Sequence, residues 1–391
     1  MASADQFPQV DDLLKSTVSY NTVNSGISGK PRSEEELVGF LQDLAERSGF
    51  ETHRLPVPDQ SDDLLILYRV ADDNPWVLFD SHLDTVSIEG MTIEPFAADE
   101  RDGRIWGRGA CDTKGSGAAM FRALWEYSQS DAPDKKKNNI ALLFSVDEER
   151  GMTGIREFVK THYPKLGFSI KGTIVGEPTK LEAVVAHNGL VRYTVTTHGI
   201  AAHSSNPSLG KSAISDMAKL ITFLEEEFIP SCDASHPLTG KAQCSINVIH
   251  GGTAANIIPD SCEIQIDRRV VPGENQDNAL KGIGEAIEDF KKKFPGSDIS
   301  WEPSIDTPAL NDAGTTSFTD DVVSILDEMG LPATVKGATY GTHAGDIQLA
   351  GLSAVVLGPG NIDQAHTKDE WIDVAELKKA VDVYNKLMYR L

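Results

Sequence analysis

The first half of the chain alternates between helical and strand-like patterns of apolar residues. Residues 34–49 place apolar side chains three or four positions apart and end at Gly49, which predicts an amphipathic helix. The run Ile140–Val146 is apolar throughout, which is typical of a parallel strand buried on both faces. Further strands are predicted at Leu64–Val70, Trp76–Phe79 and Gly172–Val175, and a further helix over Lys114–Tyr127. Strands that alternate with helices predict a three-layer α/β/α domain.

After residue 185 the pattern changes. Val191–Thr197 and Glu263–Ile266 alternate apolar with polar residues, which is typical of antiparallel strands with one buried face. Helices are predicted over Ser212–Glu227 and Asn278–Phe294. These elements predict a smaller α+β domain over residues 186–299.

The end of the chain returns to the first pattern. Residues 300–311 are polar and rich in proline, and we expect them to cross back to the first domain. A helix, a strand and a second helix follow at Phe318–Met329, Ala354–Leu357 and Val374–Tyr389. The sequence therefore predicts one discontinuous α/β domain, residues 1–185 and 300–391, with a second domain inserted over 186–299.

The net charge of the chain bears on which kinds of partner it can bind. The chain has 36 Lys and Arg against 59 Asp and Glu, a net charge of −23, without a basic patch. Such a surface repels nucleic acid and anionic lipid, so neither is expected as a partner. The sequence contains no apolar run of roughly 18 residues that would span a membrane. Its first residues also lack the basic and apolar regions of a secretory signal.

The cysteines indicate a reducing compartment. Cys111, Cys232, Cys244 and Cys262 show no C-x-x-C spacing, so we expect free thiols and a cytoplasmic protein. Cys111 adjoins Asp112, and it is either a reactive thiol or a small packed residue beside a functional site. The second alternative is favoured.

Side chains that bind metal ions follow several predicted strands. His82 lies at the carboxyl end of the strand predicted at Trp76–Phe79, and the carboxyl ends of strands are where open α/β sheets bind their ligands. Asp84 lies two residues further on, close enough to accept a hydrogen bond from the imidazole and orient it. A His-x-Asp pair alone is common and often only structural.

Asp112 is the candidate bridge between two ions. Glycines at positions 107, 109, 115 and 117 surround it and let the backbone approach a metal closely. Its two equivalent oxygens suit ions about 3.5–4 Å apart. Taken alone, Asp112 could equally be a helix cap.

Three further strands end in the same kind of residue. Asp147, Glu148 and Glu149 follow the run at 140–146, and three adjacent acids are costly unless cations neutralise them. Glu177 follows the strand at 172–175, and His366 follows the strand at 354–357 after a Gly-Pro-Gly loop. A solvated surface histidine is the ordinary interpretation of His366 alone. Together the residues predict a dinuclear metallohydrolase.

These motifs resemble the M20 metallopeptidase family, which includes acetylornithine deacetylases, succinyl-diaminopimelate desuccinylases and glutamate carboxypeptidases. The resemblance covers nearly the whole chain and rests on the segments WVLFDSHLDTV, GRIWGRGACDTKG, DEERGMTG, GTIVGEPT and LGPGNIDQAHTKDEW. It implies two Zn²⁺ ions, for which Co²⁺ or Mn²⁺ substitutes. One ion would be held by His82, Asp112 and Glu177, and the other by Asp112, Glu149 and His366.

The resemblance also implies roles for residues around the ions. Glu148 would be the general base, Asp84 would orient His82, and the peptide bond from Asp112 to Thr113 would be cis. The segment HGIAAHSSNPSLGKSA resembles the family's lid motif, with His203 placed to stabilise an oxyanion across a dimer interface. The inserted domain would therefore be both a lid and the contact of a homodimer.

Candidate substrate contacts come from two other motifs. GGTAANIIPDSCEIQIDRR resembles the family's substrate segment and offers Asn256 and Arg268, the latter suited to a free carboxylate. YGTHAGD resembles a loop near the metals and offers Thr342. His343 stands where acetylornithine deacetylases typically carry an acid.

The C-terminal motif is most similar to that of acetylornithine deacetylases. The resemblance therefore implies N2-acetyl-L-ornithine as the substrate and arginine biosynthesis as the setting. An M20 carboxypeptidase, dipeptidase or other N-acyl-amino-acid hydrolase is the alternative within this class. A non-catalytic relative that binds an acyl-amino acid is the alternative outside it.

Overall fold

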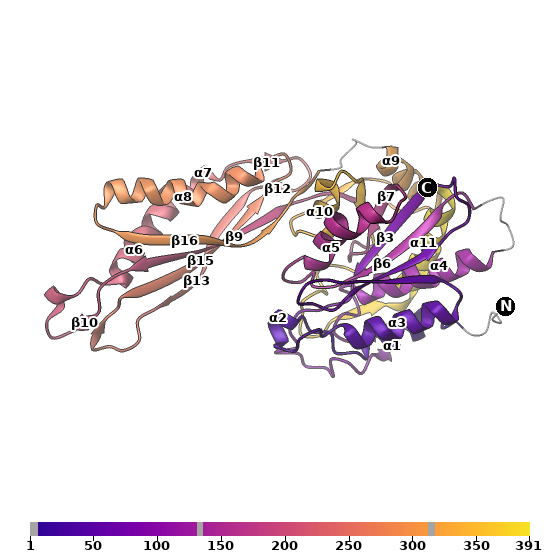
Figure 1. Cartoon of the computed structure of the whole chain (residues 1–391), viewed down its shortest axis with the longest axis horizontal. Helices are drawn as coiled ribbons and strands as arrows, with labels where there is room; N and C mark the ends of the chain where they lie inside the picture. Colours follow the sequence, from indigo (N-terminus) through magenta and orange to yellow (C-terminus); the bar gives the residue numbers. More distant parts are fainter. Residues whose placement is uncertain (1–6, 131–135, 312–316) are drawn as a thin grey trace. The chain divides into compact units, whose positions relative to one another are not determined.

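The computed structural model describes residues 7–130, 136–311 and 317–391 (Figure 1). The chain divides into two compact units. The first comprises Met1–Val185, Asp312–Lys336 and Thr342–Leu391, and the second Ala186–Asn311 and Gly337–Gly341. The predicted insertion at 186–299 lies within the second unit, which continues for a further 12 residues to Asn311.

A mixed sheet forms the centre of the first unit and confirms the predicted α/β class. Three of its strands, β6 (Asn139–Ser145), β3 (Trp76–His82) and β7 (Ile170–Val175), lie side by side and run parallel. β19 (Ala354–Val356) continues the parallel set beside β7. On the other side of β6 lie the antiparallel strands β2 (Asp63–Tyr68) and β1 (Glu51–Leu55). The carboxyl ends of four parallel strands therefore share one edge.

The parallel strands are apolar because both of their faces are covered. Every residue of β3 and β6 is buried. Helix α4 (Lys114–Gln129) packs on these two strands and also contacts α1 (Val10–Val18) and α11 (Val374–Arg390). The other α-helices of this unit in the part of the chain that the structure describes are α2 (Ser25–Ser28), α3 (Glu35–Arg47), α5 (Thr153–Glu157), α9 (Ser317–Glu328) and α10 (His343–Leu349). Predicted strands and helices of the first half are thus confirmed, with ends shifted by a few residues.

A small sheet joins distant parts of the first unit. Its strands are β4 (Asp99–Arg101), β5 (Arg104–Trp106) and β20 (Trp371–Asp373), in the order β20-β5-β4. Because β5 leads into the Asp112 loop and β20 follows His366, this pairing brings two predicted site motifs into one neighbourhood.

The second unit is a four-stranded antiparallel sheet covered by helices. The strand order is β13 (Gln243–Gly251), β15 (Ser261–Val270), β9 (Gly189–His198) and β16 (Asp298–Thr307). Buried and partly buried residues alternate along β9, in the two-residue period that the sequence predicted. Helices α6 (Ala213–Phe223) and α8 (Gln276–Lys293) pack on β9 and β15.

The expectation that residues 300–311 form a crossing segment was wrong for most of that stretch. Residues 298–307 are strand β16, which pairs with β9 at the edge of the sheet. An edge strand tolerates proline because its outer N–H groups need no partner. The register shift lies between Pro303 and Ile305, where the proline interrupts the ladder.

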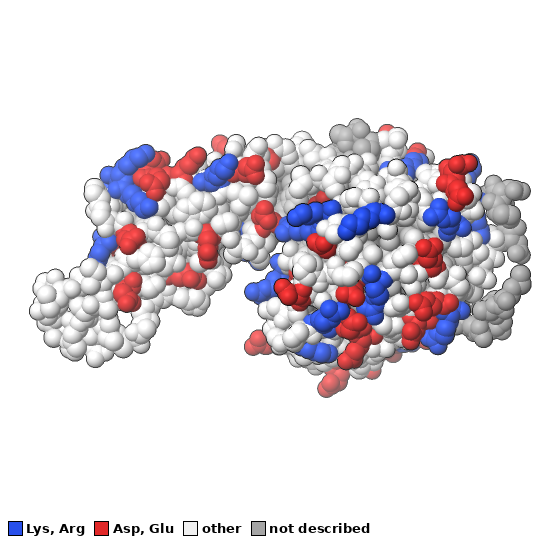
Figure 2. Space-filling model, in the orientation of Figure 1, with Lys and Arg blue, Asp and Glu red and all other residues white. Residues whose placement is uncertain are grey.

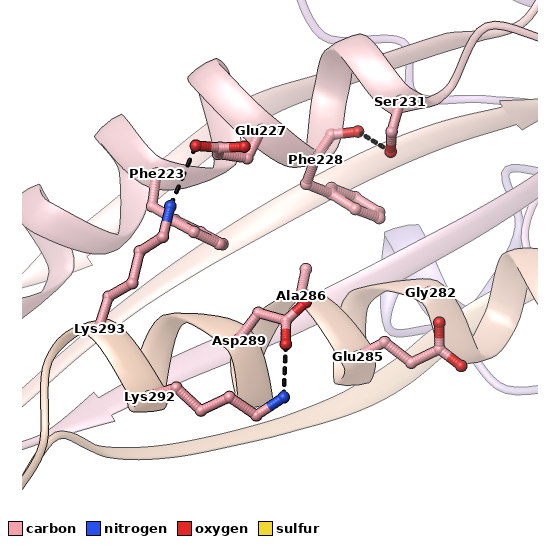
Figure 3. A pocket seen from close by; sticks show the side chains of 10 residues that line it. All are labelled: Phe223, Glu227, Phe228, Ser231, Gly282, Glu285, Ala286, Asp289, Lys292 and Lys293. Carbon is pink, nitrogen blue, oxygen red and sulfur yellow. Dashed lines mark hydrogen bonds and ion pairs between the residues drawn. The ribbon is translucent and has the colours of Figure 1, made fainter.

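A shallow groove lies between the helices of the second unit (Figure 3). Phe223 and Phe228 line one side of it, and Ala286 and Gly282 of α8 line the other, around a volume of about 580 Å³. Glu227 pairs with Lys293 at 3.0 Å. None of the predicted site residues lines this groove.

The surface mixes charges of both signs. The face in Figure 2 shows Lys and Arg interspersed with Asp and Glu, without a continuous basic area. Among the residues that the structure describes, no helix is both long enough and apolar enough to cross a membrane.

Candidate metal centre

The parallel strands deliver the predicted metal ligands to one edge of the sheet. His82 is the last residue of β3, and Glu149 and Glu177 follow the ends of β6 and β7. His366 lies in the loop after β19, with a positive φ of 58°. Parallel strands end on the same side, so four segments far apart in sequence meet there.

Two groups of three side chains have the geometry of metal sites. The first is His82, Asp112 and Glu177, and the second is Asp112, Glu149 and His366; within each group the ligand atoms all lie within 4.8 Å of one another. His82 Nε2 lies 3.2 Å from Asp112 Oδ1, and His366 Nε2 lies 3.2 Å from Asp112 Oδ2. Asp112 therefore offers one oxygen to each group.

The two histidines differ in their exposure. The His82 side chain is 2% exposed, whereas that of His366 is 53% exposed. His366 Nε2 also lies 3.2 Å from Glu149 Oε2. The group that contains His366 is thus the one nearer to solvent.

The buried carboxyl groups of this donor set lie close together, and this is the property that suits it to bind cations. Burial and the nearby Asp112 raise the pKa of Glu177 well above its usual value. Burial opposes ionisation of Asp112 too, but hydrogen bonds from His366 and His82 outweigh it and lower its pKa. Nitrogen and carboxylate donors are the ligands that zinc binds, and divalent cations would stabilise this concentration of buried carboxylates.

A buried glutamate that sequence reasoning missed holds the loop of Asp112. Glu370 Oε1 accepts the backbone N–H groups of Cys111 and Asp112 at 2.9 and 3.0 Å. Its other oxygen accepts the N–H of Gly109 at 3.0 Å and pairs with Arg108 at 2.7 Å. The carboxylate of Glu370 therefore fixes the loop from both sides. The peptide bond between Asp112 and the next residue is cis, which confirms that expectation.

Asp84 links the end of β3 to the acidic doublet. Its carboxylate accepts the N–H groups of Glu148 and Glu149 at 3.0 and 3.1 Å, and the amide of Asn24 at 2.8 Å. The imidazole Nδ1 of His82 lies 3.0 Å from the backbone oxygen of Asp84 and 3.5 Å from its carboxylate. The hydrogen-bond partner of His82 is thus mainly the main chain, and Asn24 is a further residue that sequence reasoning missed.

Glu148 belongs to neither ligand group. It is buried beside the site, and burial raises the pKa of its carboxyl group well above the usual value, with His82 acting in the opposite direction. Its backbone N–H, like that of Glu149, donates to the Asp84 carboxylate, which holds the two adjacent residues beside the site.

His343 is paired with a buried aspartate of β3. Its Nδ1 lies 2.8 Å from Asp80 Oδ2, and Ser145 donates to the other oxygen of Asp80 at 2.7 Å. His343 is buried, so it does not face solvent. Within the described part of the chain, its Nε2 has no hydrogen-bond partner. The pair therefore joins β3 to the start of α10.

Thr342 and Cys111 are engaged within the protein. Thr342 is the N-cap of α10, and its hydroxyl oxygen accepts the N–H of Ala344 at 3.1 Å. Cys111 is fully buried, and burial raises the pKa of its thiol well above the usual value. The structure therefore favours Cys111 as a packed residue.

The other predicted residues lie in the second unit. His203 is exposed on the short strand β10 (Ala202–His203), which pairs with β14 (Ile257–Ile258). The backbone oxygen of Asn256 accepts the N–H of Ser204 at 2.9 Å, so Asn256 and His203 are neighbours.

Arg268 points to the buried face of β15. Its guanidinium binds the Glu274 carboxylate and the backbone oxygen of Arg269. Arg269, one residue on, points to the opposite face of the sheet, where its side chain is 30% exposed and binds Asp267 at 2.7 Å. Of these two arginines, Arg269 is the one that solvent reaches.

The fold and the two groups of ligands define a metal-dependent hydrolase of amide bonds. The model of the peptidase family M20/M25/M40 matches residues 78–390, and the chain belongs to this family.

Named relatives in this family differ in what they cleave. The chain is 29% identical to an acetylornithine deacetylase from Photorhabdus laumondii, over 98% of this chain and 97% of the relative. It is 30% identical to a probable carboxypeptidase from Aspergillus clavatus, over 91% of this chain and 84% of the relative.

Solved structures share the fold. An M20 metallo-carboxypeptidase from Sulfolobus solfataricus aligns with a TM-score of 0.80 and 16% identity, covering 98% of this chain and 99% of that one. A dinuclear metal-binding peptidase from Bacillus subtilis aligns with a TM-score of 0.70 and 16% identity, covering 97% and 98% of the two chains.

The role of Glu370 in holding the Asp112 loop can be tested by measuring metal binding. We expect Glu370→Gln to weaken metal affinity roughly 10–100-fold, because residues that orient a ligand act on affinity to about this extent. Affinity is measured by competition with a chromophoric chelator. Asp363→Asn, which alters an exposed acid of the same loop, is the control and should bind as the wild type does. Equal affinity in Glu370→Gln and wild type would show that the clamp is dispensable.

Proposed function

We propose that this chain removes the acetyl group of N2-acetyl-L-ornithine, giving ornithine and acetate, with two zinc ions. The observation that carries the catalytic part is the pair of ligand groups that share Asp112, with Glu148 beside them. The substrate is supported by the acetylornithine deacetylase relatives, which align over almost the whole chain. Arginine biosynthesis in the cytoplasm would be the setting, and the four free thiols are compatible with it.

The ions would occupy the two groups described above, with Asp112 between them. Bound there, they would polarise the scissile carbonyl and make the attacking water more acidic. Both histidines use Nε2 toward the ligand groups, which leaves Nδ1 of His82 to donate to the Asp84 carbonyl. Such a hydrogen bond fixes the tautomer and the plane of the ring.

Glu148 would be the general base. It accepts the proton of the attacking water and later delivers that proton to the nitrogen of the leaving amine. A carboxyl group suits both steps when burial raises its pKa toward neutrality, which is the direction found for Glu148. The Asp84 carboxylate holds the backbone of Glu148, so the base keeps its position relative to Glu149.

We expect Glu148→Ala to lower kcat by roughly 10²–10⁴-fold, the usual contribution of a general base, while metal content stays near that of the wild type. Glu149→Ala is the matched variant: it should lower metal content because it removes a ligand. Turnover numbers and metal analysis by mass spectrometry separate the two roles. A Glu148→Ala variant that keeps most of its turnover would rule out this base.

We further propose a homodimer in which the second unit of one chain completes the site of the other. His203 and Asn256 lie beyond the Ser261 end of β15, whereas Arg268 and Arg269 lie seven and eight residues further along that strand. At about 3.3 Å per residue, this is roughly 23 Å or more. Figure 1 labels β10 at one end of the second unit and β11 and β12 at the other. One small substrate cannot span that distance, so the histidine and the arginine that contact it would come from different chains.

The surface around His203 supports a contact between copies. Residues 199–210 and 251–259 contain no Lys, Arg, Asp or Glu, and Figure 2 shows this end of the second unit free of charged side chains on the visible face. Ile200, Leu209 and Ile257 are exposed there. Exposed apolar side chains are typical of a protein interface, and β13 also leaves one edge of its sheet unpaired among the described residues.

Mixing two inactive variants tests this arrangement. We expect His203→Ala and Glu148→Ala each to be nearly inactive as homodimers. After they are unfolded together and refolded, a mixed dimer contains one site with an intact Glu148 and an intact His203. Random pairing should therefore restore about a quarter of wild-type turnover. No recovery, with mixed dimers present by native mass spectrometry, would place His203 in the site of its own chain.

The substrate's free carboxylate calls for an arginine. A guanidinium binds a carboxylate through two parallel hydrogen bonds. Arg268 was predicted for this role, but its guanidinium is buried and bound to Glu274, so we now favour Arg269 on the exposed face of β15. Thr342 would contact the substrate from the start of α10, which it caps.

The second candidate function is a carboxypeptidase or dipeptidase, which the relative from Aspergillus clavatus favours. We expect the highest kcat/KM for N2-acetyl-L-ornithine in a panel with succinyl-diaminopimelate, N-acetyl-lysine, N-acyl derivatives of apolar amino acids and dipeptides. A higher value for dipeptides would replace the first candidate by the second. Loss of all turnover on chelation, and its return with zinc, is expected in either case. A chain that binds metal and acyl-amino acids but turns over none of the panel would be a binding protein.

A further inference from the structure

A single buried arginine connects three segments of the first unit. Arg108 follows strand β5 and is 3% exposed. Its Nη2 donates to the backbone oxygen of Thr367 at 3.2 Å and to that of Ser87 at 2.8 Å, and its Nε also donates to Ser87. Its Nη1 donates to the Glu370 carboxylate at 2.7 Å. One side chain therefore ties together three parts of the chain, each of which carries a candidate metal ligand a few residues away.

Two of these parts carry ligands of the more exposed group. Arg108 itself precedes Asp112 in the same loop, and Thr367 directly follows His366. His366 Nε2 lies 3.2 Å from Asp112 Oδ2, and the two atoms must keep about this separation to share an ion. The bond from Arg108 to the Thr367 carbonyl oxygen therefore links the backbone segments that carry these two ligands.

His366 needs such support more than His82 does. His82 is the last residue of β3, which pairs with a strand on each side, and its side chain is 2% exposed. His366 lies in a loop with its side chain 53% exposed, and its φ of 58° is a conformation that residues other than glycine rarely adopt. Such a backbone persists only where its surroundings impose it. An arginine suits this task because its planar guanidinium holds five N–H donors in fixed directions.

We propose that Arg108 is a positioning residue of the metal centre, which sets the place of His366 relative to Asp112 and thereby the affinity for the more exposed of the two ions. The inference rests on the two-ion site of the proposed function. The guanidinium acts through the backbone of Thr367 and is not itself a ligand. The more buried ligand group depends on this bond far less, because β3 fixes its histidine.

Arg108→Lys is the variant that isolates the proposed bond. Arg108→Ala would leave the Glu370 carboxylate buried without its cation, which strongly destabilises a fold. A lysine keeps a positive charge beside Glu370, but its single ammonium group cannot replace the fork that also reaches Thr367. Arg101→Lys is the matched control, because Arg101 is exposed on strand β4 of the neighbouring small sheet. Circular dichroism verifies that each variant is folded.

Zinc binding to the full chain measures the effect. Zn²⁺ is titrated in competition with a chromophoric chelator, which gives the affinity for each ion. We expect the wild type and Arg101→Lys to bind two ions. Arg108→Lys should bind one ion as tightly as the wild type does and the other roughly 10–100-fold more weakly. Equal affinities for both ions in Arg108→Lys and wild type would overturn the proposal. A wild type that binds only one ion would overturn the two-ion site itself, and this inference with it.

A double variant shows which ligand the arginine serves. His366→Ala removes a ligand of the more exposed group and leaves one ion on the other group. Adding Arg108→Lys to His366→Ala should change the affinity for that remaining ion by no more than about twofold, since both changes act through the same ligand. A larger further loss would place the effect of Arg108 on the buried group and overturn its assignment to His366. A change that merely loosened the fold would weaken the binding of both ions alike.

Discussion

The burial of many carboxylates at one edge of the sheet is the constraint on which the site depends. Two of them, Asp84 and Glu370, are satisfied by backbone N–H groups and so serve to fix loops. The three ligand carboxylates lie beside two imidazoles instead. Even if both imidazoles were protonated, their positive charge would not balance the three carboxylates. A buried carboxylate that lacks such backbone hydrogen bonds either takes up a proton or binds a cation. The division between backbone-satisfied and cation-dependent acids therefore separates scaffold from metal centre.

The parallel core and its candidate ligands could be predicted because both correspond to short, continuous patterns in the sequence. Apolar runs such as the one ending in β6 identify buried strands, and the residue after each run lies where ligands bind. Glu370 and Asn24 were missed because their contacts join segments that are far apart in the chain. In the sequence, Glu370 stood out only as an acidic residue four positions after His366. Strand β16 was missed because it contains Pro303, and a proline is tolerated in a sheet mainly at an edge, which the sequence does not identify.

The arginines of β15 show how sensitive such predictions are to register. Neighbouring residues of a strand point to opposite faces, so an assignment that is wrong by one position changes an exposed side chain into a buried one. Arg268 pairs with Glu274 on the buried face of β15, whereas Arg269 lies with Asp267 on the other face. The motif that contains the two arginines is recognisable in the sequence. The face of the sheet to which each arginine points depends on the pairing of β15 with β9 and β13.

The order of the ligands along the chain has a consequence for synthesis. His82, Asp112, Glu149 and Glu177 all precede the second unit, whereas His366 and the Glu370 clamp follow it. A growing chain therefore contains the whole second unit before it contains His366, the last of the candidate ligands. Since β20 must pair with β5 to bring Glu370 to the Asp112 loop, the site reaches its final arrangement only after the segment that follows the second unit has been synthesised.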